Sequence, residues 1–319
     1  MQSIILKRRQ LIKSAAALGG VLVLQACGGG GNDTNLSDRK NLMELAESKQ
    51  ELSVFVEAVN AAGLRETLQA AGSNTVFAPN NDAFTALLGE LGTTKDALFA
   101  NKPLLTAVLK FHILGKVMSR DTIPEGKAIE PIGGGFFKID GLNNVYTFTD
   151  GRNRNGKVVS FDSLSLNGPL HVLDRVMLPA DKNITQTVQS RADLATLTLA
   201  LAATGAGDTL QGSGPFTLLA PNNSAFAALA VELGVTQAAL LADTAQLRNI
   251  LNYHVLQSRK LRKEIDNDSA LGTLQGGSVR INSSNQVTDA RGRISTVTTI
   301  DIISSNGVIH VVDKVLLPA

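Results

Sequence analysis

Few side chains in this 319-residue chain could carry chemistry. Cys27 is its single cysteine, and it has four histidines: His112, His171, His254 and His310. A covalent hydrolase needs a nucleophile beside a base, and a zinc site needs several Cys or His ligands. The chain has no Gly-x-Ser-x-Gly elbow. His171 and Asp174 are three residues apart, which on a strand places them on opposite faces. We therefore expect a protein that is not an enzyme, with no metal site and no cofactor.

Cys27 follows a leader in which basic residues precede an apolar run. The basic residues are Lys7, Arg8, Arg9 and Lys13, and the run covers residues 15–24. About ten apolar residues suit the core of a signal peptide, whereas a membrane-spanning helix needs roughly twenty. Leu24-Gln25-Ala26-Cys27 resembles the bacterial lipobox, in which the cysteine is acylated and becomes the first residue. We predict a signal peptide over residues 1–26 and lipidation at Cys27.

The residues on either side of this box indicate export and a tether. Residues 8–13, Arg-Arg-Gln-Leu-Ile-Lys, resemble the twin-arginine export motif. Residues 27–36 combine the lipidated cysteine with a glycine-rich, flexible tether. Gly28 follows the cysteine where an aspartate would retain an enteric lipoprotein in the inner membrane. We therefore expect an exported protein of the bacterial cell envelope, lipid-anchored at the outer membrane or on the periplasmic face.

The charge balance excludes one class of partner. Four of the 30 basic residues and no acidic residue precede Cys27, which leaves 26 basic and 28 acidic residues from there on. A nucleic-acid-binding protein needs a basic footprint, so we expect no nucleic-acid partner. Once Cys27 is acylated, no cysteine is left for a disulfide, and packing alone must hold the fold.

An internal repeat organises the rest of the chain. Residues 75–92 match residues 217–234 at twelve of eighteen positions, at an offset of 142. Residues 167–180 match residues 306–319 at an offset of 139, and all four histidines fall in paired positions. A period near 140 residues is a domain length. We predict copy one over residues 37–180 and copy two over residues 181–319. Because almost nothing separates them, we expect the two copies to touch.

Each copy shows helical patterns first and strand patterns second. In copy one, apolar residues recur at helical spacing over residues 42–59 and 84–91, with Asn80 or Asn81 as the cap of the second helix and Pro103 at the start of another. Strand patterns cover residues 75–78, 136–140, 145–149 and 158–159, and a closing strand covers residues 171–178. This order predicts an α+β fold with helices packed on a β-sandwich.

These motifs resemble those of the fasciclin domain family. The first family box is carried by residues 75–84 and 217–226, and the second by residues 167–179 and 306–318. Between them lies the Tyr-His motif, present as Phe111-His112 and Tyr253-His254. The resemblance implies two tandem domains, each a wedge-shaped β-sandwich flanked by α-helices. It also implies cell adhesion and matrix interaction, without an established catalytic site.

The Tyr-His pairs are the predicted binding residues: Phe111, His112, Tyr253 and His254. Copy two keeps the full pair, whereas Phe111 lacks the hydroxyl, so we expect copy two to be the better adhesive domain. The alternative for His112 and His254 is a structural imidazole at a helix end, bonded to nearby backbone. His171 and His310 lie in apolar strands and are expected to be structural.

Three functions remain open. The first is a non-catalytic, lipid-anchored surface adhesion module that binds a cell-surface or matrix protein or polysaccharide and contacts the membrane through its N-terminal lipid. The second is a periplasmic carrier of a small apolar ligand, which needs an apolar pocket. The third is a scaffold that spaces another envelope complex.

Overall fold

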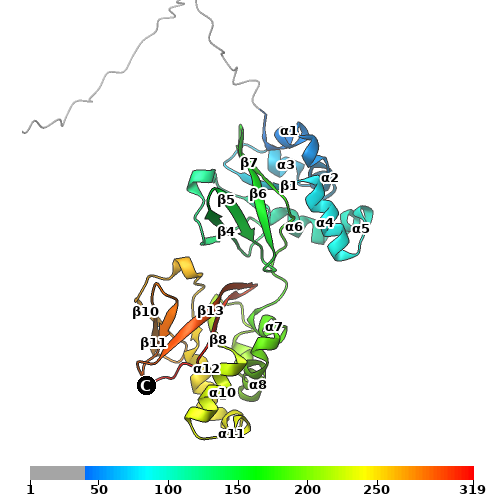
Figure 1. The fold of residues 1–319 in the computed structure, drawn as a ribbon. Helices are drawn as coiled ribbons and strands as arrows, with labels where there is room; N and C mark the ends of the chain where they lie inside the picture. Colours follow the sequence, from blue (N-terminus) through cyan, green and yellow to red (C-terminus); the bar gives the residue numbers. More distant parts are fainter. Residues whose placement is uncertain (1–39) are drawn as a thin grey trace, which may run out of the picture. The chain divides into compact units, whose positions relative to one another are not determined.

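The computed structural model describes residues 40–319, in which the two copies repeat one order of elements (Figure 1). The leader, Cys27 and tether residues 28–36 lie outside the described residues, so the predictions for them stay predictions. Residues 40–319 all belong to one unit. None of the described helices combines the length and the apolar character that a membrane crossing requires.

Copy one begins with helices and ends with strands. Its helices are α1 (Leu42–Glu47), α2 (Ser53–Ala61), α3 (Arg65–Gln69), α4 (Asn81–Leu91), α5 (Lys95–Ala100) and α6 (Lys102–Lys110), with short 3-10 turns η2 (Gln50–Leu52) and η3 (Arg120–Thr122). Its strands are β1 (Thr75–Pro79), β2 (Ile113–Leu114), β3 (Ala128–Ile129), β4 (Phe137–Leu142), β5 (Val145–Thr149), β6 (Asn155–Ser165) and β7 (Gly168–Leu173).

Copy two repeats this order. Its helices are α7 (Ile184–Gln189), α8 (Ala195–Thr204), α9 (Ala206–Thr209), α10 (Asn223–Glu232), α11 (Gln237–Ala242) and α12 (Thr244–Tyr253), with 3-10 turns η4 (Ala192–Leu194) and η5 (Arg262–Glu264). Its strands are β8 (Phe216–Pro221), β9 (Val255–Leu256), β10 (Ala270–Gly272), β11 (Ser278–Ile281), β12 (Gln286–Thr288), β13 (Ile294–Ser304) and β14 (Gly307–Val312).

The strands of each copy form one continuous seven-stranded sheet. The orders are β2-β1-β7-β6-β5-β4-β3 and β10-β11-β12-β13-β14-β8-β9. The first and last long strands of each copy, β1 with β7 and β8 with β14, pair in parallel, and the other neighbours are antiparallel. Register shifts interrupt β6 and β13, the long strands that join the two halves of each sheet. The predicted α+β class is confirmed, and the two layers of the sandwich are halves of one sheet.

Alternating side chains of β1 supply two cores in copy one. Val76 and Ala78 pack against the helices, whereas Phe77 packs with Phe137 and Phe148 from the far half of the sheet. Because residues of β1, β4, β5 and β7 share this second cluster, the sheet must curl around it. Figure 1 shows the helices of each copy gathered on one side of its strands.

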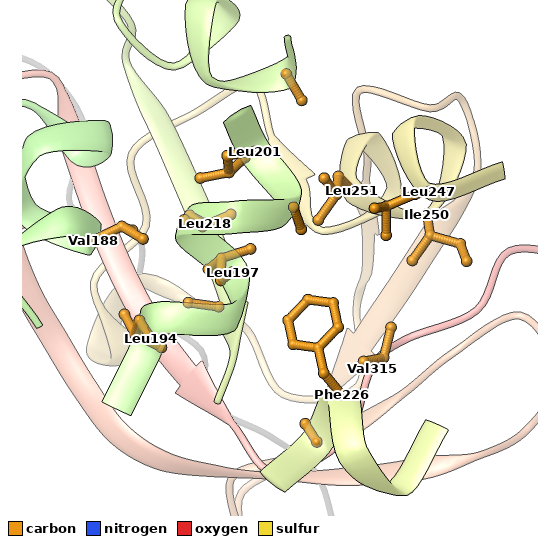
Figure 2. Packing of buried hydrophobic residues seen from close by; sticks show 14 of the residues in the cluster. Val188, Leu194, Leu197, Leu201, Leu218, Phe226, Leu247, Ile250, Leu251 and Val315 are labelled. Carbon is orange, nitrogen blue, oxygen red and sulfur yellow. The ribbon is translucent and has the colours of Figure 1, made fainter. Parts of the chain in front are cut away.

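The helical core of copy two has the same plan. Phe226 of α10 is completely buried, and Figure 2 shows its ring between side chains of α8 and α12. Those side chains include Leu197 and Leu201 on α8, and Leu247 and Leu251 on α12. Burying such a side chain stabilises the fold by about 1.5–3 kcal/mol, so packing can hold a fold that has no disulfide.

The two adjacent asparagines at the start of α4 have different roles. Asn80 is the cap, because its Oδ1 accepts the Ala83 N–H at 2.8 Å. Asn81 instead bonds to η2 and to the start of α2. Its side chain accepts the Val54 N–H at 3.0 Å and donates to the Gln50 carbonyl at 3.0 Å. One asparagine therefore starts the helix and the other fixes its position relative to α2.

Two predicted elements differ from the structure. The helical pattern over residues 42–59 is split into α1, η2 and α2, because Lys49 adopts an extended conformation between the helices. The closing strand stops at Leu173, five residues before the predicted end at residue 178. Beyond Leu173, buried Val176 and Met177 follow an irregular path whose backbone groups bond to side chains.

The Asn-Gly pair at the start of each closing strand joins the first helix to the sheet. Asn167 accepts the Leu42 N–H at 2.8 Å and donates to the carbonyls of Leu68 and Ala70 at 2.8 and 2.9 Å. Gly168 adopts a φ of +139°, and an added Cβ would lie 1.7 Å from the Asn74 carbonyl oxygen. The fold therefore requires both the amide side chain of Asn167 and the absence of a side chain at Gly168.

The two copies contact each other through one apolar cluster and several polar bonds. Phe136 of copy one packs with three side chains of copy two in a buried cluster: Leu261, Ile303 and Val308. The Lys138 ammonium lies 2.9 Å from the Asp301 carboxylate. This contact agrees with the expectation from the short linker.

Gly168→Ala should destabilise the protein by about 3 kcal/mol or more, because the new Cβ meets backbone that cannot move aside and the residue keeps an unfavourable positive φ. Gly89→Ala is the control, since Gly89 lies exposed on α4 with open space around it, and there alanine should stabilise the protein by up to about 1 kcal/mol. Denaturant unfolding followed by circular dichroism measures both. Equal effects would contradict the close approach at Gly168.

Candidate functional site

All four predicted binding residues lie at equivalent helix-to-strand junctions. Phe111 and His112 fill the two positions between α6 and β2. Tyr253 is the last residue of α12, and His254 connects it to β9. Each of the four residues has an exposed fraction of 0%. Their side chains can therefore influence a partner only through the surface that they support.

Both ring nitrogens of His112 are occupied by backbone groups. Nδ1 lies 2.8 Å from the Val108 carbonyl oxygen, and Nε2 accepts the Met177 N–H at 2.9 Å. A backbone N–H can only donate, so Nε2 is the unprotonated nitrogen and Nδ1–H donates to Val108. The ring therefore joins the last turn of α6 to the segment that follows β7.

His254 makes the same two bonds in copy two. Its Nδ1 lies 2.8 Å from the Ile250 carbonyl oxygen, and its Nε2 accepts the Leu316 N–H at 2.9 Å. The arrangement of the alternative hypothesis, an imidazole at a helix end bonded to backbone, is thus present in both copies.

Burial makes both of these rings neutral. It is the largest influence on the pKa of His112 and of His254, and it lowers each from 6.5 to about 4. The bonds to the Val108 and Ile250 carbonyls oppose this shift without cancelling it. A neutral imidazole with both nitrogens occupied is available neither as a base nor as a metal ligand.

The aromatic partner of the histidine differs between the copies. The Tyr253 hydroxyl donates to the Ser278 carbonyl at 2.6 Å and accepts the Ala290 N–H at 2.8 Å, so it links β11 to the loop before β13. Phe111 has no hydroxyl and instead meets the Phe137 ring edge-on at 5.8 Å. Copy two therefore gains two hydrogen bonds at this junction that copy one cannot make through its ring.

The second pair of histidines is also buried, with the opposite ring nitrogen protonated. His171 on β7 donates from Nε2 to the Met118 carbonyl at 2.8 Å, and its Nδ1 accepts the Asp162 N–H at 3.2 Å. His310 on β14 repeats both bonds, with the Lys260 carbonyl and the Asp301 N–H. Burial lowers the pKa of both rings.

Sequence reasoning missed one buried polar centre in each copy. Asp150 is completely buried, and its carboxylate accepts the Arg154 Nη2–H at 2.6 Å and the Leu178 N–H at 2.9 Å. In copy two, Asp289 lies 3.7 Å from Arg293 and accepts the Leu317 N–H at 3.0 Å. The signal that could have found it is an Asp-x-x-x-Arg pattern that recurs at the offset of 139.

Among residues 40–319, no group of three or more His, Cys, Asp or Glu side chains is arranged to hold a metal ion. The predicted lipidation site, Cys27, lies outside the described residues.

Each copy has a seven-stranded sheet whose closing strand begins at an Asn-Gly pair, and a buried histidine between a helix and a strand. These features define a class of domain, and comparison with family models identifies it. The model of the fasciclin domain matches residues 50–179 and 192–318. The chain therefore belongs to the fasciclin domain family.

Curated relatives from animals and bacteria are similar to this chain. Transforming growth factor-beta-induced protein ig-h3 of Sus scrofa is 30% identical over 262 residues, covering 80% of this chain and 36% of that protein. Periostin of Homo sapiens is 29% identical over 261 residues, covering 81% and 30%. Protein sll1483 of Synechocystis is 36% identical over 141 residues, covering 43% and 73%. The chain thus spans about a third of the length of the two animal proteins.

A solved FAS1 domain pair, from the insect cell adhesion molecule Fasciclin I, matches 84% of this chain and 97% of that chain. The two share 18% sequence identity, and the TM-score is 0.43.

The lowered pKa values of His112 and His254 predict acid-sensitive folding. The unfolded rings titrate near 6.5 and the folded rings near 4, so their contribution to stability is complete above pH 6.5 and is lost as the pH falls toward 4. Lowering the pH from 7 to 5 should reduce the free energy of unfolding by about 2 kcal/mol for each of the two rings.

Denaturant titrations across that range measure the slope of unfolding free energy against pH. His254→Gln should lower stability at neutral pH and reduce the slope at about pH 5.5 by the equivalent of nearly one proton. His112→Gln should do the same. An unchanged slope in both variants would contradict neutral, buried rings.

Proposed function

We propose that this protein is an exported, lipid-anchored, non-catalytic adhesion module of a bacterial cell envelope. Its partner is a cell-surface or matrix protein or polysaccharide. The observation that carries the proposal is the tandem pair of fasciclin domains, which occupies nearly all of the described chain. A pair of domains also allows two contacts with one extended partner, and the second contact then forms at a high effective concentration.

The burial and hydrogen bonding of the histidines support a binding role for the protein over a catalytic one. All four rings are buried, have lowered pKa values and bond to backbone groups on both nitrogens. The groups that sequence analysis singled out therefore act as positioning residues for the surface. The Tyr253 hydroxyl adds two bonds at this junction, which favours copy two as the better adhesive domain.

The anchor is proposed from the leader and the box that ends at Cys27. The Synechocystis relative supports a bacterial setting, because 141 residues of this chain align with that bacterial protein at 36% identity. The glycine-rich tether would let the domains reach partners away from the membrane.

The carrier alternative has less support from the described residues. A pocket of about 580 Å³ is lined chiefly by polar and charged side chains, among them Lys138, Arg152, Asn153, Asp181 and Arg191. This lining does not offer the apolar surroundings that a small apolar ligand would use.

Adhesion is tested with the chain from Gly28 to Ala319, presented to whole cells and to a panel of matrix proteins and polysaccharides. We expect saturable binding. His254→Ala should weaken it more than His112→Ala, because only copy two holds the full Tyr-His pair. Circular dichroism and thermal unfolding show which variants stay folded.

A matched control is a protein of similar size and net charge without fasciclin domains. Absence of binding above this control, across all cells and polymers, would contradict adhesion. Equal loss from two folded histidine variants would contradict the preference for copy two.

The anchor is tested in a bacterial host with a fatty-acid analogue that can be tagged. The wild-type chain should incorporate the label and sediment with membranes, whereas Cys27→Ser should lose the label and appear in the soluble fraction. Labelled Cys27→Ser, or an unlabelled wild-type chain that is nevertheless exported, would contradict lipidation at Cys27.

A further inference from the structure

One face of copy two is covered by copy one. Leu261, Ile303 and Val308 of copy two enclose Phe136 of copy one, and Ile303 keeps an exposed fraction of only 2%. The Asn153 side chain donates to the Ile303 carbonyl at 2.9 Å and accepts the Ile303 N–H at 2.6 Å. This amide pairs with the β13 backbone as a neighbouring strand would.

A buried ion pair completes the contact. The Lys138 ammonium on β4 lies 2.9 Å from the Asp301 carboxylate, whose side chain is 2% exposed. Burial alone lowers the pKa of Lys138, but Asp301 and Asp140 outweigh it and raise the pKa, so the amine is charged. Asp301 Oδ1 accepts the Arg262 backbone N–H at 2.7 Å, and Oδ2 accepts a hydrogen bond from the Lys138 ammonium.

Copy one contains the counterpart of this aspartate in the same local geometry. Asp162 stands 139 positions before Asp301, and both adopt a left-handed conformation, with φ of 52° and 59°. Asp162 accepts the Arg120 N–H at 3.1 Å and donates its own N–H to His171, as Asp301 does with Arg262 and His310. The Asp162 side chain, however, is 35% exposed.

The apolar part of the same face is also uncovered in copy one. Leu164 stands at the position equivalent to Ile303 of copy two. Leu164 is 75% exposed, whereas Ile303 is 2% exposed. Val117 and Leu166 stand at the positions equivalent to Arg259 and Ser305, which line one pocket together with Phe136, and they are 55% and 57% exposed. Apolar side chains gathered beside a partly exposed carboxylate are typical of an interaction site.

We propose that this face of copy one, formed by Val117, Asp162, Leu164 and Leu166, binds copy two of a second molecule of the same chain. The contact would use, between molecules, the faces equivalent to those that join the two copies within one molecule, with the same pairing of a carboxylate and a cation. What covers the equivalent face in copy two is a fasciclin domain, which identifies the class of occupant.

Copy two carries a suitable cation for this contact. Arg280 on β11 occupies the position that Lys138 occupies on β4, since Lys138 pairs with Ala128 and Arg280 with the equivalent Ala270. Arg280 is exposed. Where copy one has Phe136, copy two has Ser278, so the contact between molecules should be weaker than the contact within one.

The geometry is head to tail. Copy one of each molecule uses its Asp162 face, and copy two uses its Arg280 strand, so two different surfaces meet and the association does not close on itself as a two-fold dimer does. Attachment to a membrane would raise the local concentration and favour such chains of molecules.

Sedimentation velocity of the chain from Gly28 to Ala319, over low micromolar to near-millimolar concentrations, tests the proposal. The wild-type protein should show a sedimentation coefficient that rises with concentration. Asp162→Arg, Arg280→Asp and Leu164→Ser should each weaken self-association about tenfold or more. Lys102→Asp is the control, because it makes the same charge change as Arg280→Asp at an exposed site on α6.

The decisive sample is a mixture of Leu164→Ser with Arg280→Asp. Each variant is weakened at one of the two surfaces, and the two altered surfaces present like charges to each other at positions 162 and 280, so the mixture should form a one-to-one complex that does not grow further. Leu164→Ser alters an exposed side chain, so it keeps the test valid if Asp162→Arg fails to fold. A wild-type chain that stays monomeric, surface variants that associate like wild type, or a mixture that stays monomeric would overturn the proposal.

The outcome is independent of the proposed adhesion function. Binding to cells or matrix polymers can fail while self-association persists, and the reverse holds equally, because the two assays use different partners.

Discussion

Each domain depends on one constraint: backbone groups buried where the sheet departs from a regular ladder must find side-chain partners. After Leu173, the chain leaves the sheet but stays buried, and its N–H groups bond to His112 at Met177 and to Asp150 at Leu178. An unpaired buried backbone group costs about 1–3 kcal/mol. Removing these side chains would therefore cost a large share of the stability of a domain that no disulfide reinforces.

This constraint explains why the repeated polar residues carry structure. The four histidines, two aspartates and two asparagines that recur at fixed offsets all bond to backbone groups of segments distant in sequence. A histidine used in this way must remain neutral, and burial ensures this by lowering its pKa. The same property that makes it a good structural link makes it a poor catalyst. The adhesion that we propose would therefore depend on the surface, where the two copies differ.

Local patterns were enough to predict much of the fold and part of the site. Helical spacing, the Pro103 start and alternating strands indicated the right elements, because each reflects the contacts of its own residues. The early end of β7, the burial of Asp150 and the joining of two layers into one sheet depend on contacts between distant segments. His112 and His254 lie at helix ends, as the structural alternative expected, yet neither their complete burial nor the exposure of Leu164 could be read from residue types.

The two copies differ in whether one equivalent face, which holds Asp162 in copy one and Asp301 in copy two, is covered. This difference follows from the order of the copies in the chain. Copy two meets copy one through Asp301 and Ile303, so in one molecule those groups are desolvated and paired. Asp162 and Leu164 stand at the matching positions of copy one, the first copy, and are left exposed. When two copies of a domain meet through two different surfaces, each copy keeps the surface that it does not use in that contact. The same backbone bonds fix the interior of both copies, so the proposed self-association depends on these free faces.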